Sequence, residues 1–179
     1  SLYSKTIVSF ELMNVKFSPN AKFVSYVRED NNIYVINLKT KRERQLTRTG
    51  SETIANGHFG WLYEEELTGY DAYRWSLDSE YIAFWEEDEL KVPEFVMLNE
   101  LSHYPTIEKI RYPKAGENNP SLRLGFVRVK GSGKKWIKDG NVEDDYLPWM
   151  EWINKDNIAY LRLDRSQKSW ELYVSNRHT

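Results

Sequence analysis

The chain has 179 residues, and its 25 Lys and Arg against 27 Asp and Glu give a formal net charge of −2. This balance, together with the lack of a basic run interleaved with aromatics, argues against a nucleic-acid-binding surface, and a sequence without cysteine has neither disulfides nor thiolate metal ligands. Aromatic residues make up 15% of the chain although its mean hydropathy is −0.70, so we expect a core of rings and β-branched side chains in an all-β fold.

Four short strands are predicted in the first part of the chain, over residues 15–17, 22–27, 33–38 and 44–47. Tight polar turns separate them, and the pattern is typical of an antiparallel meander. The last of these turns falls in the basic cluster of residues 39–44, which is the nearest candidate for a nucleic-acid contact. Its position between two strands favours a solvated turn instead.

The end of the first strand and the start of the second recur twice. Phe-Ser-Pro-Asn-Ala-Lys-Phe-Val-Ser-Tyr at residues 17–26 matches Trp-Ser-Leu-Asp-Ser-Glu-Tyr-Ile-Ala-Phe at residues 75–84. A looser copy, Trp-Ile-Asn-Lys-Asp-Asn-Ile-Ala-Tyr, occupies residues 152–160. Repeats built from four-stranded meanders are typical of propeller blades. Because closed propellers have four to eight blades, about three blades predict a partial β-propeller, with residues 1–179 a portion of a larger domain.

The copies lie further apart than the roughly 40–50 residues of a bare blade, so segments are inserted between them. The first insertion, residues 50–70, carries three consecutive glutamates, and the second, residues 86–116, begins with an acidic patch at residues 86–89. A strand over residues 122–129 and its return form a hairpin that the sequence does not assign to a blade. We expect residues 140–145 to form an acidic loop.

Several catalytic and binding motifs are lacking. Gly-Ser-Gly-Lys at residues 131–134 lacks the flanking residues of a phosphate loop and is interpreted as a turn. The sequence contains no Gly-x-Ser-x-Gly nucleophile motif. His58, His103 and His178 have no partners at metal-ligand spacing, so structural or solvated roles are expected. We therefore predict no catalytic residue, metal or cofactor in this chain.

The glutamate run is the remaining candidate, in Gly-Trp-Leu-Tyr-Glu-Glu-Glu-Leu at residues 60–67. Its composition suits a short helix whose Trp61, Leu62 and Leu67 pack it down. Neighbouring helical residues point about 100° apart, so two carboxylates could converge on one small cation. The alternative is a solvated charge run, and composition alone favours that alternative.

The same stretch resembles the Trp-Val-Tyr-Glu-Glu-Glu motif of the dipeptidyl peptidase IV family, the prolyl-specific serine peptidases. Ile-Arg-Tyr-Pro-Lys-Ala-Gly-Glu-Asn-Asn-Pro at residues 110–120 is the most specific further match. The resemblance is collinear from about residue 12 to the C-terminus, in the style of bacterial members. Shorter matching motifs lie at residues 50–57, 92–94, 103–106, 145–148 and 161–167.

The resemblance implies an N-terminal propeller that caps an α/β-hydrolase domain. The complete peptidase of this family releases N-terminal Xaa-Pro dipeptides. It implies that Glu65 and Glu66 bind the free α-ammonium of the peptide, with Trp61, Tyr63 and Glu64 in supporting roles. The family's catalytic Ser, Asp and His lie in the hydrolase domain, which this chain does not reach, and no residue here matches a substrate-binding Arg of the family. We therefore expect the chain to be inactive alone.

The implied partners are the peptide's N-terminus, the missing blades and the hydrolase domain. Family members often form dimers and mostly work outside the cytoplasm, so the resemblance also implies a homodimer in the periplasm or outside the cell. A tripeptidyl peptidase with the same glutamate pair is a close variant of this dipeptidyl peptidase hypothesis. A non-enzymatic interaction module of the family is the alternative function, and an unrelated propeller scaffold is a third.

Overall fold

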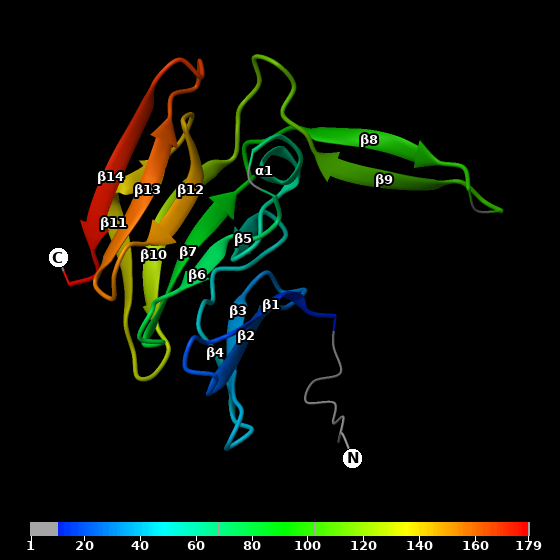
Figure 1. The fold of residues 1–179 in the computed structure, drawn as a ribbon. Helices are drawn as coiled ribbons and strands as arrows, with labels where there is room; N and C mark the ends of the chain where they lie inside the picture. Colours follow the sequence, from blue (N-terminus) through cyan, green and yellow to red (C-terminus); the bar gives the residue numbers. More distant parts are fainter. Residues whose placement is uncertain (1–10, 68, 102, 179) are drawn as a thin grey trace.

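A computed structural model describes residues 11–67, 69–101 and 103–178. The described residues form an almost all-β chain whose antiparallel sheets match a partial propeller, as predicted. The described residues form three sheets that follow one another in chain order, one short helix and a separate hairpin, arranged as in Figure 1. The propeller arrangement stacks the faces of neighbouring sheets, which is how their apolar side chains are removed from water.

The first sheet is the meander expected from the sequence, in the order β1-β2-β3-β4. Its polar turn between β3 and β4 is exposed, as expected for a solvated turn. The strands are β1 (Met13–Phe17), β2 (Phe23–Val27), β3 (Ile33–Asn37) and β4 (Glu43–Gln45).

The second sheet has the order β11-β10-β7-β5, and β6 also pairs with β7. It contains the hairpin around the Gly-Ser-Gly turn, which therefore belongs to the second blade. The third sheet has the order β12-β13-β14. The strands are β5 (Ile54–Asn56), β6 (Tyr73–Trp75), β7 (Tyr81–Asp88), β10 (Ser121–Arg128), β11 (Lys134–Val142), β12 (Tyr146–Trp152), β13 (Asn157–Leu163) and β14 (Trp170–Asn176).

Two boundaries expected from the sequence are wrong. Residues 86–88 are not an inserted acidic patch but the end of β7, where Glu86 and Glu87 pair with Arg123 and Leu122 of β10. Residues 140–142 are not loop but the end of β11, which pairs with the start of β10. In both cases a long-range ladder supplies the backbone hydrogen bonds that the local sequence does not indicate.

The repeats adopt equivalent local structures. Ser18 and Ser76, which open the turn in the first two copies, each accept a backbone N–H five residues later, at 3.0 and 2.9 Å. The tryptophans that precede the turns bind the preceding sheet, since Trp75 donates to the Ser25 hydroxyl at 2.7 Å and Trp152 to the Arg74 carbonyl at 3.1 Å. In the second and third copies, this aromatic position thus joins consecutive blades.

The second sheet is buried on both faces. Ile82 and Phe84 of β7 pack into a cluster shared with the first sheet. Ala83 and Trp85 point the other way, into a cluster shared with the third sheet and the helix. Side chains that alternate along a strand face opposite sides, so β7 contributes to two blade interfaces.

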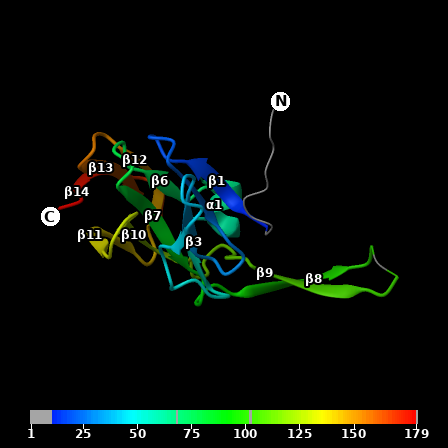
Figure 2. The ribbon, with the colours of Figure 1, turned by 90° about the horizontal axis from the view of Figure 1, so that it is seen from below.

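A hairpin leaves the body of the molecule between β7 and β10. It consists of β8 (Glu94–Asn99) and β9 (Thr106–Arg111), which pair only with each other. It extends away from the sheets in both views (Figures 1 and 2). The hairpin accounts for most of the second insertion predicted from the repeat spacing.

Candidate functional site

The glutamate run lies on the helix α1 (Trp61–Glu66), within the first insertion. Gly60 is the N-cap residue and has an extended conformation. Because glycine has no side chain, the helix has no side-chain N-cap hydrogen bond. At the other end, the N–H groups of Leu67 and Gly69 both donate to the Tyr63 carbonyl, at 3.3 and 3.1 Å. Gly69 has a φ of 85°, the left-handed conformation that ends many helices.

Three contacts hold α1 in place. The Gly60 N–H donates to the Glu87 side chain. Trp61 packs on Tyr112, with ring centroids 4.2 Å apart, at the base of the β8–β9 hairpin. Tyr63 is fully buried and joins the helix to the third sheet, because its hydroxyl accepts the Leu147 N–H at 3.0 Å.

The carboxylates of Glu64, Glu65 and Glu66 are exposed on this anchored helix. Glu64 lies toward Tyr70, whose pKa is raised by burial and by the charge of Glu64. Within the residues that the structure describes, the carboxylates of Glu65 and Glu66 take part in no hydrogen bond or ion pair. Two carboxylates side by side offer enough acceptor positions for the three donors of an ammonium group.

Of the two aromatic residues predicted to support the site, Trp61 is half-buried and Tyr63 is buried. The structure therefore has an anchored helix with free carboxylates at its last turn. That arrangement suits binding of a cation that approaches from solvent.

A second pair of glutamates, Glu86 and Glu87, lies beneath the helix on β7. Glu86 points away from α1. It accepts a hydrogen bond from the Thr49 hydroxyl and pairs with Arg123 of β10 at 2.5 Å. Glu87 points toward α1 and is completely buried. Burial, with a contribution from the neighbouring charge of Glu89, raises the pKa of Glu87 to about 8, although the Gly60 N–H opposes the shift.

Glu89, which is half-buried, lies next to these two glutamates. Burial raises the pKa of Glu89 to about 7, with Arg111 opposing and Asp88 adding to the shift. Its carboxylate lies against Gly60, where any Cβ atom would overlap it. The start of α1 therefore lies between two carboxyl groups whose pKa values are raised into the neutral range.

The burial of Glu87 predicts a pH-dependent stability. Its pKa is raised on folding, so the folded state holds the proton that the unfolded state has released above about pH 4.5. The stabilisation is complete below that pH and is lost as pH rises toward 8. Between these limits the free energy of unfolding should fall by at most about 5 kcal/mol more in the wild type than in Glu87→Gln. Urea titrations of both chains at several pH values measure this difference, and parallel pH profiles would contradict it.

Sequence reasoning missed Glu87 because adjacent charges predict a solvated patch. The only local signal is the apolar run that leads into it, Tyr81 to Trp85, which predicts a strand but not where the strand stops. Its burial depends on pairing with Leu122 on one side and Ala55 on the other. That information lies outside the local sequence.

The other candidates offer no comparable site. His58 is largely buried and bonded to Asn31, at 2.8 Å from Nε2 to Oδ1, and burial lowers its pKa. No group of three or more His, Cys, Asp or Glu in the described ranges is placed to hold a metal ion. In the same ranges, no helix is both long and apolar enough to cross a bilayer.

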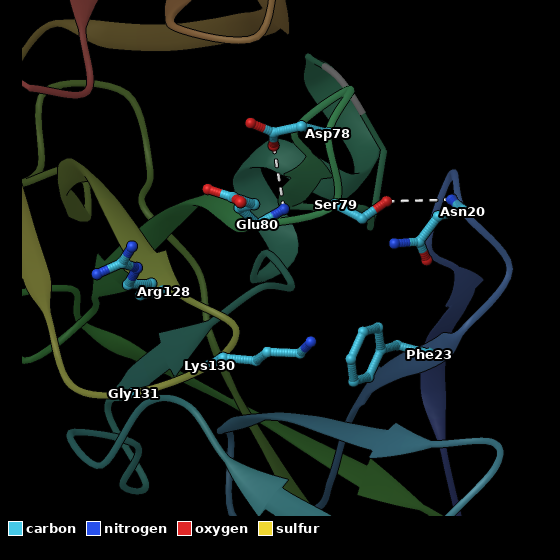
Figure 3. Close-up of a pocket in the computed structure, with 8 residues that line it drawn as sticks. All are labelled: Asn20, Phe23, Asp78, Ser79, Glu80, Arg128, Lys130 and Gly131. Atoms are coloured by element: carbon cyan, nitrogen blue, oxygen red, sulfur yellow. Dashed lines mark hydrogen bonds between the residues drawn. The ribbon is translucent and has the colours of Figure 1, made fainter.

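A cavity of about 440 Å³ lies between the turns of the first two sheets (Figure 3). Its charged residues are engaged in the fold: Asp78 pairs with Arg177 at 2.7 Å, and Lys130 lies over the Phe23 ring. No residue of α1 lines it. The cavity is therefore separate from the glutamate site.

Comparison with known proteins gives a consistent family. The family model described as "Dipeptidyl peptidase IV (DPP IV) N-terminal region" matches residues 3–179. Dipeptidyl aminopeptidase B of Saccharomyces cerevisiae is 35% identical over 92% of this chain and 22% of its own length. A probable dipeptidyl-aminopeptidase B of Arthroderma gypseum is 37% identical over 89% of this chain and 19% of its own.

Solved structures agree. The crystal structure of Porphyromonas gingivalis dipeptidyl peptidase 4 has a TM-score of 0.90 and 32% identity, covering 97% of this chain and 25% of that one. A putative dipeptidyl aminopeptidase IV from Bacteroides ovatus shares the fold, with a TM-score of 0.79 over 94% of this chain and 22% of that one. The chain thus spans a quarter or less of the length of these relatives.

Proposed function

Because the chain belongs to the dipeptidyl peptidase IV family, through that family's N-terminal region, we propose that it is the propeller portion of a serine exopeptidase that releases N-terminal Xaa-Pro dipeptides. In this proposal Glu65 and Glu66 bind the α-ammonium of the peptide substrate. Catalysis belongs to an α/β-hydrolase domain outside residues 1–179. The observation that carries the proposal is the exposed carboxylate pair on a helix anchored at three points.

The physical role of the pair is to set a distance. An ammonium held by two carboxylates fixes the peptide's N-terminus, so a nucleophile at a fixed position reaches the same peptide bond in each substrate. An acetylated N-terminus has no charge and too few donors, which leaves both carboxylates unpaired in a closed complex. Free-amine specificity follows from this arrangement.

The test compares a Gly-Pro chromogenic peptide with its N-acetyl form. We expect a complete protein, in which this chain is joined to its hydrolase domain, to cleave the free-amine peptide at least about a hundredfold better in kcat/KM. Residues 1–179 alone should release no product above background. Specific turnover by the isolated chain, or equal cleavage of both peptides, would contradict the proposal.

The exposed hairpin supports a second element of the proposal, a homodimer. Val96, Leu98 and Ile107 share one face of the hairpin and are more than half exposed. An isolated two-stranded hairpin is marginally stable in water, so burial of this apolar face against a second copy would stabilise it. A protein-contact role without catalysis, the alternative function, would use the same surface. The presence of Gly-x-Ser-x-Gly in the hydrolase domain separates the two functions.

The dimer is tested by a pair of cross-strand substitutions. Leu98→Glu with Ile107→Glu places two like charges opposite each other on the hairpin face. Sedimentation velocity should show the complete protein as a dimer and this variant as a monomer. Leu77→Glu, at an equally exposed leucine in a blade turn, should remain dimeric. A monomeric wild type, or a dimeric hairpin variant, would rule out this interface.

A further inference from the structure

We propose that Glu87 is a positioning residue, which fixes the start of α1 through the Gly60 amide and thereby the placement of Glu65 and Glu66. The inference rests on the proposed role of those two carboxylates. Glu87 does not itself contact the substrate amine in this proposal. It acts through the helix.

Glu87 is suited to this role because it stands on a rigid support. It has no exposed surface, and β7 is paired on both sides at this residue, with Leu122 of β10 and Ala55 of β5. Its carboxyl group points away from Glu86 and accepts the Gly60 N–H. The start of the helix is thus held in place by a strand that is itself paired on both sides in the second sheet.

Trp61 and Tyr63 hold the first turn of the helix through their side chains, whereas Glu87 holds the backbone at the residue that precedes it. The first N–H groups of any helix lack partners within it, and the N-cap residue here has no side chain with which to cap them. Gly60 lies against Glu89 so closely that a side chain cannot be added without displacing that carboxylate. A side chain at residue 60 would therefore shift the Glu89 carboxylate beside the contact that Glu87 makes.

A displacement at Gly60 is carried to the carboxylates because α1 is short. Five and six residues separate Gly60 from Glu65 and Glu66 in sequence, which corresponds to roughly 8–9 Å along a helix axis. Within that length the helix moves as a unit. A tilt or shift of its first turn moves both carboxylates together, and binding weakens before chemistry is affected.

The chemistry of Glu87 indicates which substitution preserves its role. Its Oε1 atom has no hydrogen-bond partner among the described residues, and the carboxylate of Glu89 lies nearby. Burial and that neighbouring charge favour the neutral carboxylic acid. Glutamine is neutral, has the same shape and keeps an oxygen for the Gly60 N–H. Methionine has a similar size but only a weak sulfur acceptor.

The experiment measures steady-state kinetics of the complete protein on a free-amine Gly-Pro peptide, for Glu87→Gln, Glu87→Met and Glu86→Gln. We expect Glu87→Met to raise KM about tenfold with kcat within about twofold of wild type, and Glu87→Gln to keep both constants. Glu86→Gln disturbs the same strand on its opposite face and should leave KM unchanged. An unchanged KM in Glu87→Met, or an equal rise in Glu87→Gln and Glu86→Gln, would overturn the proposal.

Hydrogen exchange in the 179-residue chain gives a readout that needs no activity. The Gly60 amide should exchange at least about tenfold faster in Glu87→Met than in wild type, and Glu87→Gln should restore its protection. Equal protection in all three chains overturns the contact on which the inference depends. The double variant Glu65→Gln with Glu66→Gln distinguishes a failure of the proposed amine site from a failure of the positioning role of Glu87. If it leaves KM unchanged, the amine site itself is wrong, and if it raises KM while Glu87→Met does not, only the positioning role fails.

Discussion

Replacing Glu65 and Glu66 together by glutamine should lower kcat/KM for free-amine peptides by about 10²–10³-fold in the complete protein. Each carboxylate contributes a charge-assisted hydrogen bond worth about 1.5–3 kcal/mol. Glutamine keeps the size and one acceptor oxygen but removes the charge. Steady-state kinetics on a Gly-Pro chromogenic peptide measures the loss, which should come mainly from KM because the amine is bound before and during the reaction.

The matched control is a second pair of exposed glutamates. Glu29→Gln with Glu52→Gln changes the net charge by the same amount at two exposed glutamates outside α1, one in the turn between β2 and β3 and one between β4 and β5. Its kcat/KM should stay within about twofold of wild type, because long-range effects of exposed charges are screened by salt. Equal losses in both double variants would mean that the effect is one of net charge and not of amine binding.

Replacing Tyr63 by alanine should destabilise the 179-residue chain by about 3–5 kcal/mol. The side chain is fully buried, stacks on Phe59 at a centroid distance of 4.6 Å and accepts the Leu147 N–H. Its removal creates a cavity between the helix and the third sheet and leaves a buried N–H without a partner. Urea unfolding followed by tryptophan fluorescence gives the difference in free energy of unfolding.

Tyr63→Phe divides this cost into its parts. It keeps the ring and the stacking on Phe59 but removes the acceptor for the Leu147 N–H, so it should cost about 1–3 kcal/mol. A loss as large as that of Tyr63→Ala would mean that the hydroxyl carries the whole effect. No loss in either variant would mean that α1 is not coupled to the folding of the sheets.

The sheets were largely predictable because their signals are local. The turn at Ser18 and its copy at Ser76 use the same serine-to-backbone bond, so a common sequence specifies a common structure. The ends of β7 and β11 could not be located, since they extend along partners that lie far away in sequence. The β8–β9 hairpin was anticipated only as an insertion, because it has no core to impose a clear alternation on its residues.

The site was predictable only in part, and for a different reason. Exposed glutamates on a helix have the same composition whether they bind a cation or are simply solvated, and only the resemblance to a family pointed to Glu65 and Glu66. What holds them in place is not local. Glu87, which accepts the Gly60 N–H, lies on β7, and Leu147, whose N–H donates to Tyr63, lies on β12 of the third sheet.

The close approach of Gly60 to Glu89 bears on protein engineering. A short glutamate-rich helix looks portable, yet transplanting residues 61–66 into another scaffold would leave behind the glycine, the carboxyl groups of Glu87 and Glu89 beneath it and the Leu147 N–H that donates to Tyr63. The smallest unit that could be grafted therefore comprises α1 with Gly60, β7 with Glu89, and the first residues of β12. An amine-recognition module designed from this fold would have to copy that three-part unit and not the helix alone.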